Sequence, residues 1–344
     1  GLKGKSIDKR ELPASNLVFL IDVSGSMQPA NKLRLGKSAL RLLVNELREE
    51  DHVAIVVYAG AGGLVLPPTS GANKTRILHA IDNLEAGGST AGGAGIKVAY
   101  EVARQHHIRG GNNTVILATD GDFNVGVSSD AEMVRLIEEK RGQGTFLTVL
   151  GFGMGNYKDS RLEKLADKGN GNYAYVDDLT EAKKVFVHEF GGTMYTIAKD
   201  VKLQIEFNPR FVGAYRLVGY ENRMLRKEDF NNDRKDAGEM GAGHTVTALY
   251  EIVPPGEPVP SGEVDPLKYQ QPVDPPVKGI ATNSTELMNI KVRYKAPEAE
   301  SSKLLEFPVR ESTQKMTANL GFAAAVAEFG VVLRRSVFKG SASW

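Results

Sequence analysis

Three short polar motifs carry oxygen side chains in positions where a metal ion could be bound. The first is the run Asp22-x-Ser24-x-Ser26, in which two hydroxyls follow a carboxylate at two and four residues. The second supplies the hydroxyl of Thr90 from a glycine-rich loop, and the third supplies the carboxylate of Asp120. Hard oxygen donors of this kind suit Mg²⁺, Ca²⁺ or Mn²⁺ better than softer metals. We therefore predict one divalent cation, with Mg²⁺ the first choice, bound by these five residues and water.

The hydrophobic pattern places these motifs at one edge of a sheet. From Asn16 to about Lys199, short β-branched runs alternate with amphipathic helices, which is typical of a mostly parallel sheet covered on both faces. Asp22 follows the apolar run 17–21, and Asp120 comes just after the run 114–118. Ligands of parallel sheets collect beyond the carboxyl ends of the strands. Both carboxylates are therefore expected at the same edge.

The same pattern predicts the other elements of this half. Strands are expected at 52–58, 64–66, 146–150 and 171–176, and helices at 33–47, 74–83, 91–107, 131–141, from Ser160, and at 180–199. Pro67 and Pro68 are expected to end the strand at 64–66. The last of these helices, Thr180–Lys199, leads directly into Val201 of the second half of the chain.

After Asp200, the spacing of the apolar residues changes from a helical period to every second residue. Val201–Phe207 alternates strictly between apolar and polar residues, as in a strand with one wet face. Similar segments recur at 211–220, 245–253 and 287–294, separated by a charged loop at 221–239 and a proline-rich stretch at 254–277. An alanine-rich helix around 319–335 is expected to be buried.

These patterns together predict the fold class and its division. The fold class is α/β, with a doubly wound, mostly parallel, Rossmann-like sheet, a second, smaller antiparallel β domain and a C-terminal helix. The expected boundaries are 1–15 for an N-terminal segment assigned as a strand of the second domain, 16–199 for the α/β domain, 200–312 for the β domain and 313–344 for the last helix.

Composition excludes several classes of function. The 43 basic and 42 acidic side chains nearly cancel, so the chain lacks the electrostatic footprint of a nucleic-acid-binding protein. The absence of cysteine excludes disulfides, thiolate metal sites and a cysteine nucleophile. No membrane span is expected, because the longest apolar stretch, 320–333, contains Glu328 and falls short of the roughly 20 residues that a span requires. The oligomeric state is left open.

The five oxygen-bearing residues, in this order and context, resemble the metal-ion-dependent adhesion site of von Willebrand A domains. The resemblance implies that Ser24 and Ser26 bind the ion directly and that Thr90 does so in a high-affinity state. It also implies that Asp22 and Asp120 act directly or through water. The alternative for the first motif is a helix N-cap, because serine and aspartate satisfy free backbone amides at such turns.

Several longer stretches resemble bacterial YfbK-like proteins, whose A domains are similar to those of inter-alpha-trypsin inhibitor heavy chains. These stretches are 16–27, 219–223, 236–239, 241–251 and 322–330. The resemblance implies a place in the bacterial cell envelope, periplasmic or surface-exposed, with a lipid anchor as one option for the full-length protein.

The predicted function is metal-dependent protein binding, or adhesion, rather than catalysis. The resemblance implies that an Asp or Glu of a protein partner completes the shell of the cation. One alternative is a scaffold that the metal merely stabilises. Another is a magnesium-dependent hydrolase, but phosphatases of the haloacid dehalogenase type need a second aspartate where Ser24 stands, and no Gly-x-Ser-x-Gly elbow surrounds Ser24 or Ser26.

Overall fold

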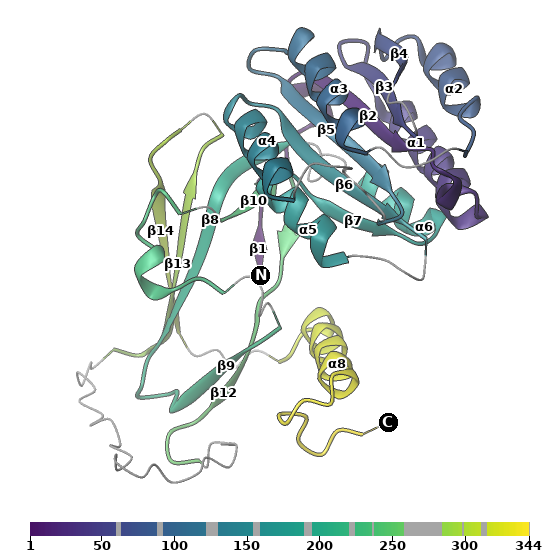
Figure 1. Ribbon diagram of the computed structural model, residues 1–344. Helices are drawn as coiled ribbons and strands as arrows, with labels where there is room; N and C mark the ends of the chain where they lie inside the picture. Colours follow the sequence, from purple (N-terminus) through teal and green to yellow (C-terminus); the bar gives the residue numbers. More distant parts are fainter. Residues whose placement is uncertain are drawn as a thin grey trace.

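A computed structural model gives the fold of the chain (Figure 1). It describes residues 1–59, 63–87, 92–121, 130–153, 159–188, 195–219, 224–235, 237–257, 284–297, 299–310 and 315–343. One end of the molecule is a sheet covered by helices, and the other consists of antiparallel strands and the last helix. The α/β fold class with an additional antiparallel β region and a C-terminal helix is confirmed.

The α/β half is built on a six-stranded sheet with the order β4-β3-β2-β5-β6-β7. Its strands are β2 (Ser15–Asp22), β3 (His52–Tyr58), β4 (Gly63–Ser70), β5 (Asn112–Thr119), β6 (Phe146–Phe152) and β7 (Tyr173–Val176). All neighbours are parallel except β4, which is antiparallel to β3. β2 lies in the middle and is buried along its whole length, because its apolar run has helices on both faces.

Helices cover the two faces of this sheet (Figure 1). They are α1 (Leu35–Glu46), α2 (Lys74–Asp82), α3 (Gly92–Gln105), α4 (Asp130–Gly142), α5 (Asp159–Lys168) and α6 (Leu179–Lys183). Successive side chains of a strand point to opposite faces. Phe19 therefore belongs to one core with residues of α1, α2 and α6, and Leu20 belongs to the other with residues of α3, α4 and α5.

The predicted end of the strand at 64–66 is wrong. Pro67 and Pro68 do not end the strand but lie inside it, since β4 continues to Ser70. Proline lacks a backbone N–H and is tolerated where no further strand needs that donor. β4 is the outermost strand of the sheet, and its pairing with β3 is irregular around Ile55.

The described strands outside the six-stranded sheet form three antiparallel sheets. The largest has the order β10-β8-β13-β14, and the other two are the pairs β12-β9 and β1-β11. The strands are β1 (Leu2–Lys3), β8 (Thr196–Phe207), β9 (Ala214–Val218), β10 (Gly238–Gly241), β11 (Thr245–Val246), β12 (Leu249–Val253), β13 (Glu286–Lys295) and β14 (Lys303–Arg310). β14 was not expected from the sequence, because Pro308 interrupts its pattern, but it too is an edge strand.

The prediction of one long helix over Thr180–Lys199 is wrong. Helix α6 passes into a π-helical turn, η4 (Lys184–His188), and residues 196–199 already belong to β8. There Ala198 pairs with Met240 of β10, and Lys199 pairs with Lys295 of β13. Pairing with strands from distant parts of the chain outweighs the local helical pattern at these residues. One continuous helix therefore does not run from the α/β half into β8.

The C-terminal helix α8 (Ala318–Leu333) is present, but the expectation that it is buried is wrong. Val331 and Val332 are its buried residues, whereas Phe322 is 73% exposed and Phe329 is 55% exposed. Apolar residues lie on all sides of this helix, so its sequence does not show which side packs. No helix in the described ranges is long and apolar enough to cross a membrane.

The start of the chain is fastened to both halves. Gly4 N–H donates to the His244 carbonyl at 2.8 Å, next to the pairing of β1 with β11. A few residues later, Lys9 Nζ lies 2.7 Å from Glu46 Oε2 at the end of α1. The chain therefore crosses between the halves twice, first between Lys5 and Lys9 and later between His188 and Thr196.

A buried ion pair fixes the amino-terminal edge of the six-stranded sheet. Asp51 accepts hydrogen bonds from the Ser15 N–H at 2.9 Å, the Arg48 N–H at 2.8 Å and the Arg48 guanidinium at 2.9 Å. The same guanidinium donates to three backbone carbonyls within Lys9–Pro13 at 2.7–3.1 Å. All these groups are satisfied within the chain, which makes this a structural network.

Substitution of Arg48 should therefore destabilise the α/β half. Arg48→Ala leaves the buried carboxylate of Asp51 without its cation, which typically costs about 3–5 kcal/mol of unfolding free energy. The matched control is Arg104→Ala, because Arg104 pairs with Glu101 on the exposed surface of α3 and should matter little. Urea unfolding followed by far-UV circular dichroism measures both variants, and equal losses would contradict the structural role of Arg48.

Candidate metal centre

Asp22 ends β2 with a carboxylate that is fully buried. Its Oδ1 accepts a hydrogen bond from the Ser24 N–H at 2.9 Å. Its Oδ2 accepts one from the Tyr58 hydroxyl at 2.9 Å and a longer one from the Thr119 hydroxyl at 3.3 Å. These donors come from the following turn and from the ends of β3 and β5, so they fix the orientation of the carboxylate.

Ser24 and Ser26 lie on the short turn that follows β2. Their hydroxyl oxygens are 2.9 Å apart, with Ser24 buried and Ser26 exposed. Ser24 occupies the N-cap position of the 3-10 turn η2 (Gly25–Met27), but its side chain makes no capping hydrogen bond there. This observation argues against the helix-cap alternative and leaves a pair of neutral oxygens next to Asp22.

Asp120 follows β5, the strand that pairs in parallel with β2. Its side chain is only 2% exposed, and its Oδ2 lies 2.8 Å from Lys32 Nζ. Burial raises the pKa of the Asp22 carboxyl, hydrogen bonds from Ser24 and Tyr58 oppose this change, and the negative charge of Asp120 adds to it. The two carboxylates are therefore near enough to repel each other, as expected of groups that share one cation.

Thr90 lies outside the described residues. The nearest described point before Thr90 is Gly87, whose N–H donates to the Val23 carbonyl at 2.8 Å. The segment that leads to Thr90 therefore starts beside the turn that carries Ser24. The structure thus brings four of the five predicted residues to one edge and gives no position for the fifth.

The donors at this edge fit a hard divalent cation. Two buried carboxylates and two hydroxyls provide oxygen ligands. Among the described residues, the positive charge beside them is that of Lys32. Within the described ranges, no three His, Cys, Asp or Glu side chains come together. A cation here would thus be held by Asp22, Ser24, Ser26 and Asp120, with water or other oxygens in the remaining positions.

Three further described side chains lie at this edge and were not predicted from the sequence. Tyr58 is the last residue of β3 and stands opposite Asp22 in the parallel register, which only the strand pairing reveals. Thr119 directly precedes Asp120, so proximity along the chain could have indicated it. Lys32 lies in the π-helical turn η3 (Ala30–Arg34), and no spacing rule connects it with Asp120.

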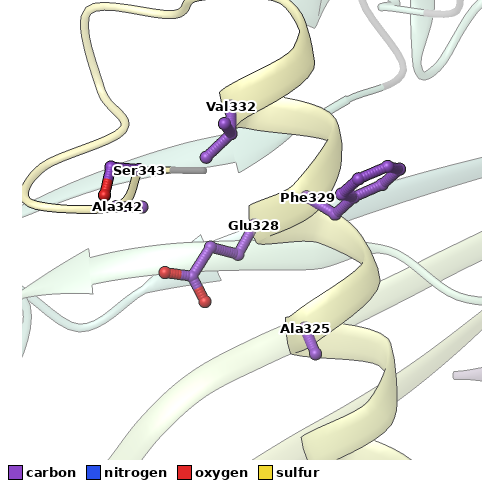
Figure 2. A pocket seen from close by; sticks show the side chains of 6 residues that line it. All are labelled: Ala325, Glu328, Phe329, Val332, Ala342 and Ser343. Carbon is purple, nitrogen blue, oxygen red and sulfur yellow. The ribbon is translucent and has the colours of Figure 1, made fainter.

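A separate hollow of about 320 Å³ lies between α8 and the last residues of the chain (Figure 2). Figure 2 shows Glu328 on the side of the helix that faces Ala342 and Ser343. Its lining is mostly small or apolar, with one carboxylate. It adds no set of donors comparable to the edge at Asp22.

Tyr58→Phe should destabilise the protein in EDTA, because it removes a buried hydrogen bond to a carboxylate, typically worth about 1.5–3 kcal/mol. Tyr100→Phe is the matched control. The Tyr100 hydroxyl is equally buried but has no hydrogen-bond partner among the described residues, so its removal should be neutral or slightly stabilising. Denaturant unfolding measures both variants. A larger loss for Tyr100→Phe than for Tyr58→Phe would contradict the hydrogen-bonding of Asp22.

Two protein-family models match the chain. The model described as von Willebrand factor type A domain matches residues 16–188, half of the chain, and includes all five candidate ligands. The chain therefore belongs to the von Willebrand factor type A family. The model described as "Uncharacterized protein YfbK, C-terminal" matches residues 192–344, so the second half is that of the YfbK-like group.

Similar proteins agree with this assignment. The chain is 46% identical over 341 residues to "Uncharacterized protein YfbK" of Escherichia coli, covering 99% of this chain and 58% of that protein. It is 29% identical over 166 residues to human inter-alpha-trypsin inhibitor heavy chain H3, covering 45% of this chain and 18% of that protein. The chain thus spans less than two thirds of the length of these relatives.

Solved structures include a similar chain described as von Willebrand factor type A from Catenulispora acidiphila. The TM-score is 0.48 at 18% sequence identity, and the match covers 93% of this chain and 72% of that chain.

Proposed function

We propose that this protein binds a protein partner through a divalent cation held by Asp22, Ser24, Ser26, Thr90 and Asp120. The observation that carries the proposal is the convergence of two buried carboxylates and a pair of serine hydroxyls at the carboxyl edge of the sheet. Von Willebrand A domains often serve as metal-dependent interaction modules, and the family membership supports the same use here.

The residues of the edge have distinct tasks in this proposal. Tyr58 and the Ser24 N–H orient the carboxylate of Asp22, and Ser24 offers a buried hydroxyl beside it. Ser26 is exposed, so the site opens to solvent on the side of that residue. When bound, the cation, Mg²⁺ in the first instance, supplies a positive charge that attracts an Asp or Glu of the partner. That carboxylate would complete the coordination shell of the cation.

Binding is favoured over catalysis by the chemistry of the serine pair. Ser24 stands where phosphatases of the haloacid dehalogenase type need a second aspartate. Its hydroxyl lies 2.9 Å from that of Ser26, which gives two neutral oxygens rather than a nucleophile and a base.

Two units are part of the proposal. We propose that the six-stranded sheet with its helices and the antiparallel sheets with α8 fold as separate units that meet between His188 and Thr196. The two family matches, 16–188 and 192–344, support this division.

Removal of the cation or of Asp22 should abolish partner binding. Full-length chain immobilised in Mg²⁺ should capture a partner from a bacterial envelope extract, and calorimetry with the identified partner should show no binding in EDTA or by Asp22→Ala. Glu101→Ala, which removes an exposed carboxylate on α3, should bind as the wild type does. The strand signal of the β half should be unchanged in Asp22→Ala.

The opposite results define the competing functions. Equal partner affinity in Mg²⁺, in EDTA and in Asp22→Ala would contradict metal-dependent binding and shift attention to the antiparallel half. Reduced stability in EDTA with unchanged partner affinity would instead indicate that the metal only stabilises a scaffold.

We also propose a location in the bacterial cell envelope, outside the cytoplasm. This proposal rests on the resemblance to YfbK-like proteins. Fractionation of the full-length native protein should place it in the periplasmic or membrane fraction, and recovery in the cytosol would contradict it.

A further inference from the structure

Lys32 brings a positive charge to the candidate metal centre. Its Nζ lies 2.8 Å from Asp120 Oδ2, and the two side chains are 17% and 2% exposed. Lys32 belongs to η3, between the turn of Ser24 and Ser26 and helix α1, and its backbone angles there (φ −117°, ψ −105°) depart from helical geometry. One of the two carboxylate oxygens that Asp120 could offer to a divalent cation thus accepts a hydrogen bond from an ammonium group.

The backbone after β6 is shaped to receive the lysine stem. Gly153 has φ +85°, and a Cβ at this position would lie 2.6 Å from Lys32 Cε and 2.9 Å from Cγ. The Gly153 carbonyl accepts a hydrogen bond from the Tyr175 hydroxyl at 2.5 Å, which fixes this segment to β7. The aliphatic part of Lys32 therefore packs directly against Gly153. Any other residue at position 153 would displace the Lys32 side chain, so this lysine is more restricted than one on the open surface.

The charges at this edge allow the ammonium and the cation to exclude each other. Asp22 and Asp120 are both buried, and Lys32 compensates Asp120 with one positive charge. A divalent cation near Asp120 meets both a blocked oxygen and a like charge, and repulsion between like charges is strong where burial lowers the local dielectric. The side chain of Lys32 is 17% exposed, so part of it reaches solvent.

We propose that Lys32 competes with the divalent cation for Asp120, and so sets the cation concentration at which the protein binds its partner. The inference rests on the proposed function, because it assumes a cation at this site. Lys32 is a positioning residue in this scheme: it holds Asp120 and yields it, but it touches no partner. Cation binding then releases an ammonium group at the rim of the site.

The test is the cation affinity of Lys32→Met, which keeps most of the stem and removes the charge. Calorimetry with MgCl₂ and MnCl₂ on the full chain should show affinity increased by roughly 5- to 150-fold, the usual range for coupling between two binding events. Lys168→Met is the matched control, since Lys168 pairs with Glu138 away from the site and its loss should leave cation affinity unchanged. Lys32→Gln is a second variant that keeps a hydrogen-bond donor if Lys32→Met folds poorly.

Thermal unfolding gives an independent readout. In EDTA, Lys32→Met should melt below the wild type, because Asp120 has lost its compensating charge. With Mg²⁺, the variant should gain more melting temperature than the wild type gains, because a ligand stabilises in proportion to its affinity. A purely structural ion pair would predict the loss in EDTA but no larger gain with Mg²⁺.

The outcomes separate this inference from the proposed function. If the wild type binds the cation as tightly as both Lys32 variants, or more tightly, the proposed competition between Lys32 and the cation is wrong. The proposed function would then remain intact. Cation binding by the variants alone would support competition in its strongest form. No cation binding by any of these proteins at millimolar concentrations would overturn both proposals.

Discussion

Asp22 ends the central strand with a buried carboxylate, and a buried charge is stable only where hydrogen-bond donors or opposite charges surround it. The donors come from three segments: the turn after β2, the end of β3 at Tyr58 and the end of β5 at Thr119. Strand register and the tight serine turn bring these three donors to the carboxylate, whereas Asp120 adds a second negative charge beside it. The site is therefore a property of the sheet edge rather than of a single loop.

Buried carboxylates lie at both edges of the six-stranded sheet, but they are compensated in different ways. At the amino-terminal edge, Asp51 is satisfied by Arg48 and two backbone amides, and the network is closed within the chain. At the carboxyl edge, the described part of the chain brings the positive charge of Lys32 to Asp120, and a serine pair opens to solvent at Ser26. Among the described residues, carboxylates thus outnumber cationic groups at the carboxyl edge, whereas Asp51 and Arg48 balance each other at the amino-terminal edge.

The sequence predicts those features that depend on local pattern. The apolar runs before Asp22 and Asp120 identify two buried strands, and parallel strands bring both carboxylates to one edge. Tyr58 and Lys32 depend on strand register and on an irregular turn, which no local pattern encodes. The helical pattern toward Lys199 gave way to pairing with distant strands, and α8, apolar on all sides, gave no sign of which side would pack.

The double crossing of the chain has a mechanical consequence. One crossing is held at both ends, by Gly4 bonded to His244 on one side and by Arg48 bonded to Lys9 on the other, and the second runs from His188 to Thr196. The segment between Gly4 and Lys9 is short. If the halves moved apart by more than this segment can span, either the Gly4–His244 hydrogen bond or the contacts of Lys9 with Arg48 and Glu46 would have to break.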